Sequence, residues 1–157
     1  MVTLDVKLND PKAEYISEIK IKRQDAMRGR VRTVARNGEE IIVDLPRGEV
    51  IDDGEILKSS TIGNSYKLLI EQEPVVKVTL NNKENSNHLE NALKLGYNLG
   101  NRHLEVLIED GIVFVPITIG EEKVKKILDK MKLPIKYETV NKIVSPNSEG
   151  YHAGEDE

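Results

Sequence analysis

Three histidines, His88, His103 and His152, are the only imidazole side chains in the 157 residues of this chain, which contains no cysteine. The lack of cysteine excludes a disulfide framework, a Cys-ligated zinc or iron–sulfur site and a thiol nucleophile. Any site built from imidazole therefore has few candidates, and one histidine per chain supplies too few ligands for a metal ion. His88 falls in the first turn of an expected helix, where a protonated imidazole opposes the helix dipole, and we expect it to be a solvated surface residue.

Enzyme signatures are missing from the sequence. It contains no Ser/His/Asp motif with flanking glycines, no Gly-rich phosphate loop and no His-Glu-x-x-His. Asn101 and Arg102 could hold an oxyanion in an acylphosphatase-like hydrolase, but no Gly-rich anion cradle accompanies them. We therefore expect a protein that is not an enzyme, and the hydrolase alternative predicts turnover that depends on Arg102.

The composition limits the partners and the location. The formal net charge is −4 and aromatic residues make up 4% of the chain, which argues against a basic, stacking groove for single-stranded nucleic acid. No apolar run approaches the roughly 18 residues of a membrane span, and residues 1–10 lack the apolar core of a signal peptide. We therefore expect a cytoplasmic protein with no membrane partner and no nucleic-acid partner.

A basic segment offers an alternative function. Five of the seven arginines lie between Arg23 and Arg36, and such a cluster suits an acidic protein partner or RNA. On this alternative the protein is a metal-free interaction or RNA-binding module whose arginines carry the binding. We favour the other interpretation of the segment, a solvated β-ribbon and loop.

Residues 1–73 are predicted to form a small all-β domain. Short β-rich runs are separated by turn signals every ~8–12 residues, which is typical of a sandwich or barrel. Asn37-Gly38 is the strongest of these signals and predicts a hairpin. The expected strands cover residues 15–22, 31–35, 41–45, 56–59 and 66–71, and residues 23–30 are expected to be a connector.

Beyond residue 73 the pattern changes to alternating strands and helices. A helix over 86–99 has an apolar stripe at helical spacing, and Gly100 is placed to end it in the left-handed conformation. A second helix follows the capping box Thr118-x-x-Glu121. The stripes are Leu89, Ala92, Leu93, Gly96 and Val124, Ile127, Leu128, Met131, and the expected strands cover 75–80, 104–108, 112–116 and 135–140.

The order β-α-β-β-α-β is that of a ferredoxin-like domain, which we place at residues 74–143. Residues 144–157 are polar, Gly-containing and acidic, and they are predicted to form a mobile C-terminal tail. The predicted fold class is therefore α+β, with an all-β domain, a ferredoxin-like domain and a tail.

His103 is expected to open the strand over 104–108. Alternation along that strand places Leu104, Val106 and Ile108 under the helices, so His103 should project from the open face of the sheet. A two-fold dimer brings a residue near its axis next to its own copy. Two imidazoles at an axis suit nickel, zinc or copper, and His152 in the tail could add a ligand from each chain.

The residues around His103 resemble a known signature. Residues 96–103, Gly-Tyr-Asn-Leu-Gly-Asn-Arg-His, resemble the Tyr-x-Leu-Gly-Asn-Arg-His motif of the UreE family of urease accessory nickel chaperones. Residues 32–40, 45–48 and 53–55 resemble the N-terminal domain of that family, and residues 145–152 resemble its C-terminal tail.

The resemblance implies a homodimeric nickel metallochaperone that functions in urease maturation. It implies an N-terminal domain of the partner- or peptide-binding type and a ferredoxin-like domain that binds metal and dimerises. Ni²⁺ would lie between the two copies of His103, with His152 as a further ligand, and Zn²⁺ or Cu²⁺ can substitute in vitro. The implied partners are the urease accessory GTPase and the apo-urease maturation complex. Many relatives have histidine where this chain has Asn98, and many have a His-rich tail, so we expect one interfacial ion per dimer.

Overall fold

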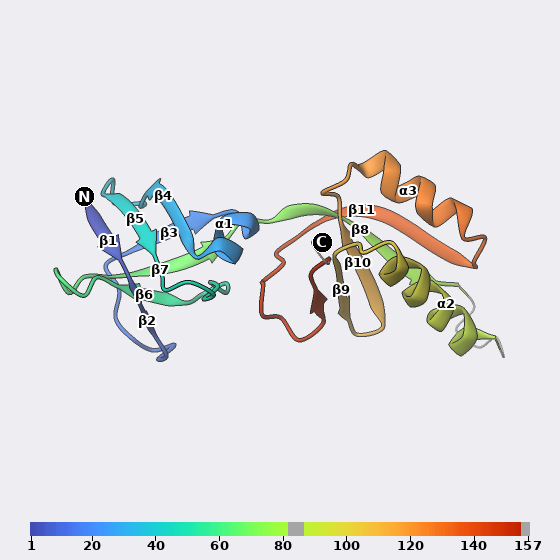
Figure 1. Cartoon of the computed structure of the whole chain (residues 1–157), viewed down its shortest axis with the longest axis horizontal. Helices are drawn as coiled ribbons and strands as arrows, with labels where there is room; N and C mark the ends of the chain where they lie inside the picture. Colours follow the sequence, from blue (N-terminus) through green and yellow to red (C-terminus); the bar gives the residue numbers. More distant parts are fainter. Residues whose placement is uncertain (82–86, 155–157) are drawn as a thin grey trace. The chain divides into compact units, whose positions relative to one another are not determined.

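The protein is described here by a computed structural model that defines residues 1–81 and 87–154. The chain forms two compact units, shown in Figure 1. Unit 1 consists of Met1–Gln72 and Ile143–Ser148, and unit 2 consists of Glu73–Lys142 and the residues from Glu149 onward. The chain therefore first passes from unit 1 to unit 2 after residue 72, one residue before the boundary that the sequence predicts. Ser86, the predicted start of the first long helix, and residues 155–157 of the predicted tail lie outside the described residues.

Unit 1 is built from two β-sheets, in agreement with the all-β prediction. Two short strands at the N-terminus, which the sequence patterns do not predict, join one sheet each. The first sheet has the order β1 (Val2–Leu4), β5 (Glu40–Asp44), β4 (Arg30–Val34), and the second has the order β2 (Val6–Leu8), β6 (Ile56–Lys58), β7 (Ser65–Ile70), β3 (Ser17–Ile21). The hairpin predicted at Asn37-Gly38 is confirmed, because β4 and β5 pair in antiparallel register around it.

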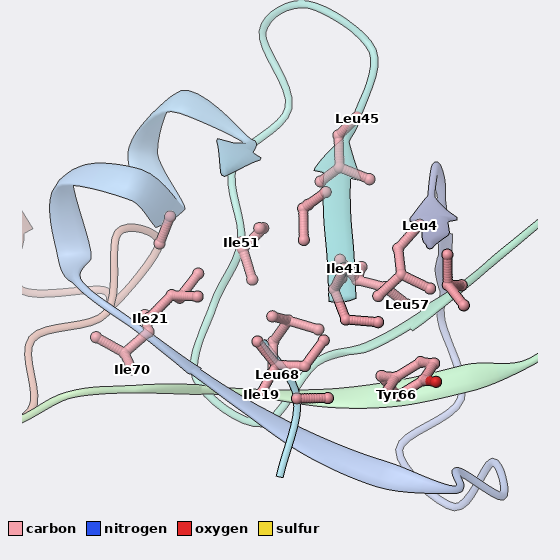
Figure 2. Packing of buried hydrophobic residues seen from close by; sticks show 14 residues of the cluster. Leu4, Ile19, Ile21, Ile41, Leu45, Ile51, Leu57, Tyr66, Leu68 and Ile70 are labelled. Carbon is pink, nitrogen blue, oxygen red and sulfur yellow. The ribbon is translucent and has the colours of Figure 1, made fainter. Parts of the chain in front are cut away.

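The apolar side chains of both sheets share one core. Figure 2 shows Leu4, Ile41, Leu57 and Leu68, from four different strands, gathered with Tyr66 in this cluster. Each of these side chains is 1% exposed or less. Burying one large apolar side chain stabilises a fold by about 1.5–3 kcal/mol, so this cluster is the main source of stability in unit 1.

A short helix replaces the connector that the sequence predicts after β3. Helix α1 (Arg23–Arg28) ends at Gly29, whose φ of 66° is left-handed. A Cβ at Gly29 would lie 2.5 Å from the carbonyl oxygen of Glu49. Glycine is therefore required here for two reasons, the backbone conformation and the close approach of residue 49.

Residues 143–148 belong to unit 1, whereas the sequence predicts that residue 143 ends the ferredoxin-like domain and that 144–148 begin a mobile tail. Val144 is fully buried. The Ser145 hydroxyl donates a hydrogen bond to Asp52 Oδ1 (2.7 Å), and Asn147 donates from its backbone N–H to the same oxygen (2.7 Å) and from its side chain to Oδ2 (2.8 Å). Burial alone would raise the pKa of Asp52, but these hydrogen bonds outweigh burial and lower the pKa.

Unit 2 has the predicted ferredoxin-like arrangement. Its five-stranded antiparallel sheet has the order β11 (Ile135–Lys142), β8 (Glu73–Leu80), β10 (Ile112–Pro116), β9 (Val106–Glu109), β12 (Tyr151–His152). Helices α2 (His88–Asn101) and α3 (Glu121–Lys130) supply buried residues to one core with the sheet, so both helices cover the same face. Strand β12 comes from the segment that was predicted as tail and extends the sheet beyond β9.

Helix α3 begins differently from the prediction. Gly120 is the N-cap and no side chain caps the helix, so the predicted capping box at Thr118 is wrong. Glu121 is the first helical residue. Its carboxylate accepts a hydrogen bond from Thr139 and forms an ion pair with Lys125. The predicted apolar stripe is confirmed, because Val124 and Leu128 are buried in the core.

Within the described residues, no helix has the length and apolar character needed to cross a membrane.

Candidate metal centre

His103 lies in the turn that ends helix α2. The N–H of His103 bonds to the carbonyl of Gly100 (3.0 Å), and the N–H of Leu104 reaches back to the carbonyl of Leu99 (3.4 Å). This pair of bonds is a Schellman motif, in which the residue after the C-cap adopts the left-handed conformation. Here Arg102 is the C-cap and His103, with φ of 55°, is the left-handed residue.

Two predictions about this turn are therefore wrong. Gly100 does not end the helix, because α2 continues to Asn101. His103 does not open a strand, because β9 begins only at Val106. The physical reason is that histidine, like asparagine and aspartate, enters the left-handed region more readily than most non-glycine residues.

His152 reaches the same region on the edge strand β12. Tyr151 pairs with Leu107 and His152 pairs with Val106 of β9. Neighbouring residues in a strand point to opposite faces, so His152 shares the face of Val106, which belongs to the core under the helices. Tyr151 points to the other face, where its hydroxyl donates a hydrogen bond to Glu105 Oε2 (2.8 Å).

A pocket of about 360 Å³ brings the two histidines together within one chain. Both residues are exposed, so their imidazoles are accessible at its surface. The walls are mostly apolar and come from the end of α2, from β9 and β10, and from the segment around β12. The lining residues are Gly96, Leu99, Gly100, His103, Leu104, Val106, Ile108, Val113, His152, Ala153 and Gly154. His103 therefore does not project from the open face of the sheet, where the sequence places it, but lies beside the helix-covered face.

The third histidine is in a different place. His88 is the first residue of α2 and lines another pocket, together with Asp110 and Lys136. It is half-buried, and its Nδ1 is shielded from solvent, so it differs from the solvated surface residue that the sequence predicts. Asn98 is absent from the lining of the His103 pocket, and its side-chain amide donates a hydrogen bond to the Lys94 carbonyl (2.8 Å).

An exposed apolar face runs along α2 toward the His103 pocket. Leu89, Leu93 and Tyr97 follow one another at four-residue spacing, and they are 72%, 65% and 72% exposed. The predicted stripe included Leu89 and Leu93, but the helix faces the sheet with Leu95 and Leu99 instead. The helix therefore has two apolar faces, of which only one is buried within this chain.

The basic segment of unit 1 is largely neutralised. Arg23 is buried, at 2% exposed. Three other arginines form ion pairs with carboxylates of the same unit: Arg28 with Asp25 (3.0 Å), Arg30 with Asp44 (3.1 Å) and Arg36 with Glu18 (3.4 Å). These pairs reduce the net positive charge that the segment presents to a polyanion.

Two imidazoles in an apolar surround are a suitable donor set for a borderline divalent metal such as nickel, zinc or copper. Within residues 1–81 and 87–154 of a single chain, no group of three or more His, Cys, Asp or Glu side chains is arranged to hold a metal ion. The sequence singles out both histidines of the pocket. It gives no indication of the left-handed turn at His103 or of the strand that carries His152.

Comparison with known proteins gives consistent matches along the chain. Residues 4–61 match the family model described as "UreE urease accessory protein, N-terminal domain", and residues 73–157 match "UreE urease accessory protein, C-terminal domain". The second match alone covers more than half of the chain.

Individual relatives carry the same name. A "Urease accessory protein UreE" of Prochlorococcus marinus is 32% identical over 98 residues, which are 62% of this chain and 60% of the relative. The protein of that name from Nostoc sp. is 31% identical over 85 residues, 54% of each chain. The one from Nitrosospira multiformis is 25% identical over 114 residues, 72% of this chain and 60% of the relative. The alignments thus span three fifths or less of these relatives. Together with the two family matches, they show that the chain belongs to the UreE family of urease accessory proteins.

Proposed function

We propose that this protein is a nickel metallochaperone, which binds Ni²⁺ as cargo through His103 and His152 and delivers it for assembly of the urease active site. The observation that carries the proposal is the shared pocket of the two histidines, which are far apart in the sequence. Imidazole nitrogen is a ligand that Ni²⁺ accepts well, and Zn²⁺ or Cu²⁺ should compete for the same site in vitro.

A second copy of the chain completes the ligand set. Each copy supplies two imidazoles, so a dimer with His103 near its two-fold axis supplies up to four to one ion. The exposed face of Leu89, Leu93 and Tyr97 supports this arrangement, because an apolar helix face of this kind is typical of an interaction surface. Gly96 and Gly100 of the same helix line the His103 pocket, so a dimer formed along α2 would bring the two pockets close together.

Delivery requires that the ion also leaves. The ligands of the proposed site are few and lie at the surface, and histidine binds a metal only in its neutral form, so acidification favours release. The relatives are named urease accessory proteins. We therefore infer a carrier and not an enzyme, with the urease accessory GTPase and the apo-urease maturation complex as the receiving partners.

Calorimetric nickel titration of the full-length protein tests the proposal. His103→Gly removes the imidazole and retains the left-handed turn, and nickel affinity should fall by more than about 100-fold. His88→Ala is the matched control, because His88 lines a different pocket, and its affinity should equal that of the wild type. Tight nickel binding by His103→Gly would overturn the proposed site, and a wild-type protein that binds no nickel would overturn the function.

A further inference from the structure

The segment that carries His152 lies very close to the backbone of its neighbours. Gly150 precedes β12 and Gly154 follows it, so these two glycines bracket His152. A Cβ added to Gly150 would overlap the carbonyl oxygen of Ile108 and lie 2.8 Å from its carbonyl carbon. A Cβ added to Gly154 would overlap the carbonyl oxygen of His103 and lie 3.3 Å from its carbonyl carbon. The obstructing atoms are backbone, which cannot rotate out of the way as a side chain does.

Conformational freedom does not explain glycine at these two positions. Neither Gly150 nor Gly154 is among the residues with positive φ, in contrast to Gly111 and Gly120 in the same unit. A left-handed φ is therefore not the reason for glycine at position 150 or 154. A Cβ at either position would meet backbone atoms of Ile108 or His103, so close approach is the reason that glycine is needed.

The close approach permits a set of specific contacts. The N–H of Ile108 donates a hydrogen bond to the Gly150 carbonyl (2.8 Å). The ladder continues through Tyr151 and His152, which pair with Leu107 and Val106 of β9. At the other end, Gly154 passes directly over the backbone of the His103 turn. A longer distance between Gly150 and Ile108, or between Gly154 and His103, would break this register and move His152 away from the pocket.

We propose that Gly150 and Gly154 are positioning residues of the metal site: they dock β12 on β9 and on the His103 turn, and thereby hold His152 in the pocket of the same chain. This inference rests on the proposed nickel function. The docked strand contains two residues, so its detachment would remove one imidazole from the site while the rest of unit 2 stays folded. The docked segment is therefore the removable part of the ligand set, and His103 is the fixed part.

Two measurements on the full chain test the inference. Hydrogen exchange of the metal-free protein reports docking through the Ile108 amide, which is bonded to Gly150. Calorimetric titration with Ni²⁺ reports the site. The variants are Gly150→Ala and Gly154→Ala, each of which adds one methyl group. The control is Glu149→Asp, which removes one methylene group at an exposed position next to Gly150 that does not line the pocket.

The expected results are quantitative. Gly150→Ala should speed exchange at Ile108, and each glycine variant should weaken nickel binding by roughly 10–100-fold, the usual effect of losing a positioning residue of a metal site. His152→Ala should weaken binding by a similar factor. Combining Gly154→Ala with His152→Ala should cause no further loss, because both changes remove the same imidazole, whereas independent effects would multiply. Glu149→Asp should match the wild type in both assays.

The outcomes separate this inference from the proposed function. If His103→Gly abolishes nickel binding and the glycine variants bind like the wild type, the function stands and the positioning role is refuted. Multiplicative losses in the double variant would also refute it, because Gly154→Ala would then act through the His103 turn and not through His152. If the wild type binds no nickel, both proposals fall. Unchanged Ile108 exchange in Gly150→Ala would refute the docking independently of any metal.

Discussion

Replacing His103 by glycine is expected to destroy the metal site and at the same time to relax the turn that holds it. His103 has φ of 55°, a conformation that costs a non-glycine residue about 1–2 kcal/mol. Glycine avoids this cost but gives the unfolded chain more freedom, which offsets roughly 0.4–1 kcal/mol. Alanine retains the left-handed cost and also lacks the imidazole. We therefore expect metal-free His103→Gly to exceed His103→Ala in stability by about 1 kcal/mol, a roughly fivefold difference in the folded-to-unfolded ratio.

Urea unfolding followed by NMR signals of β8 and β10 measures this difference in unit 2, where the turn lies. Signals of individual residues are needed because a chain with two units need not unfold in a single transition. Asp110 provides a matched control, since it also has a left-handed φ, of 51°, and lies in the hairpin between β9 and β10. Asp110→Gly should likewise exceed Asp110→Ala by about 1 kcal/mol, and both variants should bind nickel normally.

Two results would refute the reasoning about His103. Equal stabilities of His103→Gly and His103→Ala, with a clear difference at Asp110, would mean that the left-handed turn is not populated at His103. Nickel binding retained in His103→Gly would mean that the turn is correct and the ligand assignment is not.

Three further changes test other parts of the structure. Gly29→Ala should destabilise unit 1 by more than about 2 kcal/mol, because the left-handed cost adds to the overlap with Glu49, whereas Gly48→Ala, which meets no neighbouring atom, should cost about 1 kcal/mol in urea unfolding. Hydrogen bonds lower the pKa of Asp52, so its contribution to stability is complete above the ordinary carboxyl pKa and is lost as the pH falls through the lowered value. An Asp52→Asn variant should lack this acid-dependent loss. The same slope of unfolding free energy against pH in both proteins would exclude the contribution. Leu93→Glu should shift the protein to monomers in analytical ultracentrifugation without changing its circular dichroism spectrum, and an unchanged dimer would rule out the exposed face of α2 as the contact.

The elements of unit 2 could be predicted because their sequence signals are local. The strand predicted over 112–116 and the stripe of Val124 and Leu128 depend on a few adjacent residues, and both are present. The orientation of helix α2 was harder to predict, because the helix has two apolar faces and periodicity alone does not tell which one packs on the sheet. The structure buries Leu95 and Leu99 and leaves Leu89 and Leu93 exposed.

The site depended on features that sequence patterns do not carry. His103 was predicted to start a strand because the apolar alternation begins directly after it. Three backbone hydrogen bonds at the end of α2, donated by the N–H groups of residues 102–104, instead hold it in a turn. The segment around His152 was predicted to be mobile because it is polar and contains glycine. Its glycines instead permit close backbone contact with Ile108 and His103, and this contact is visible only in three dimensions.

The most direct test of the central claim is the position of the metal. Crystals of the full chain grown with one Ni²⁺ per dimer should give a single strong anomalous peak at the nickel absorption edge, between the two copies of His103 and within bonding distance of both imidazoles, with His152 of at least one chain beside it. A nickel peak bound elsewhere, or at one His103 without its copy, would contradict the account.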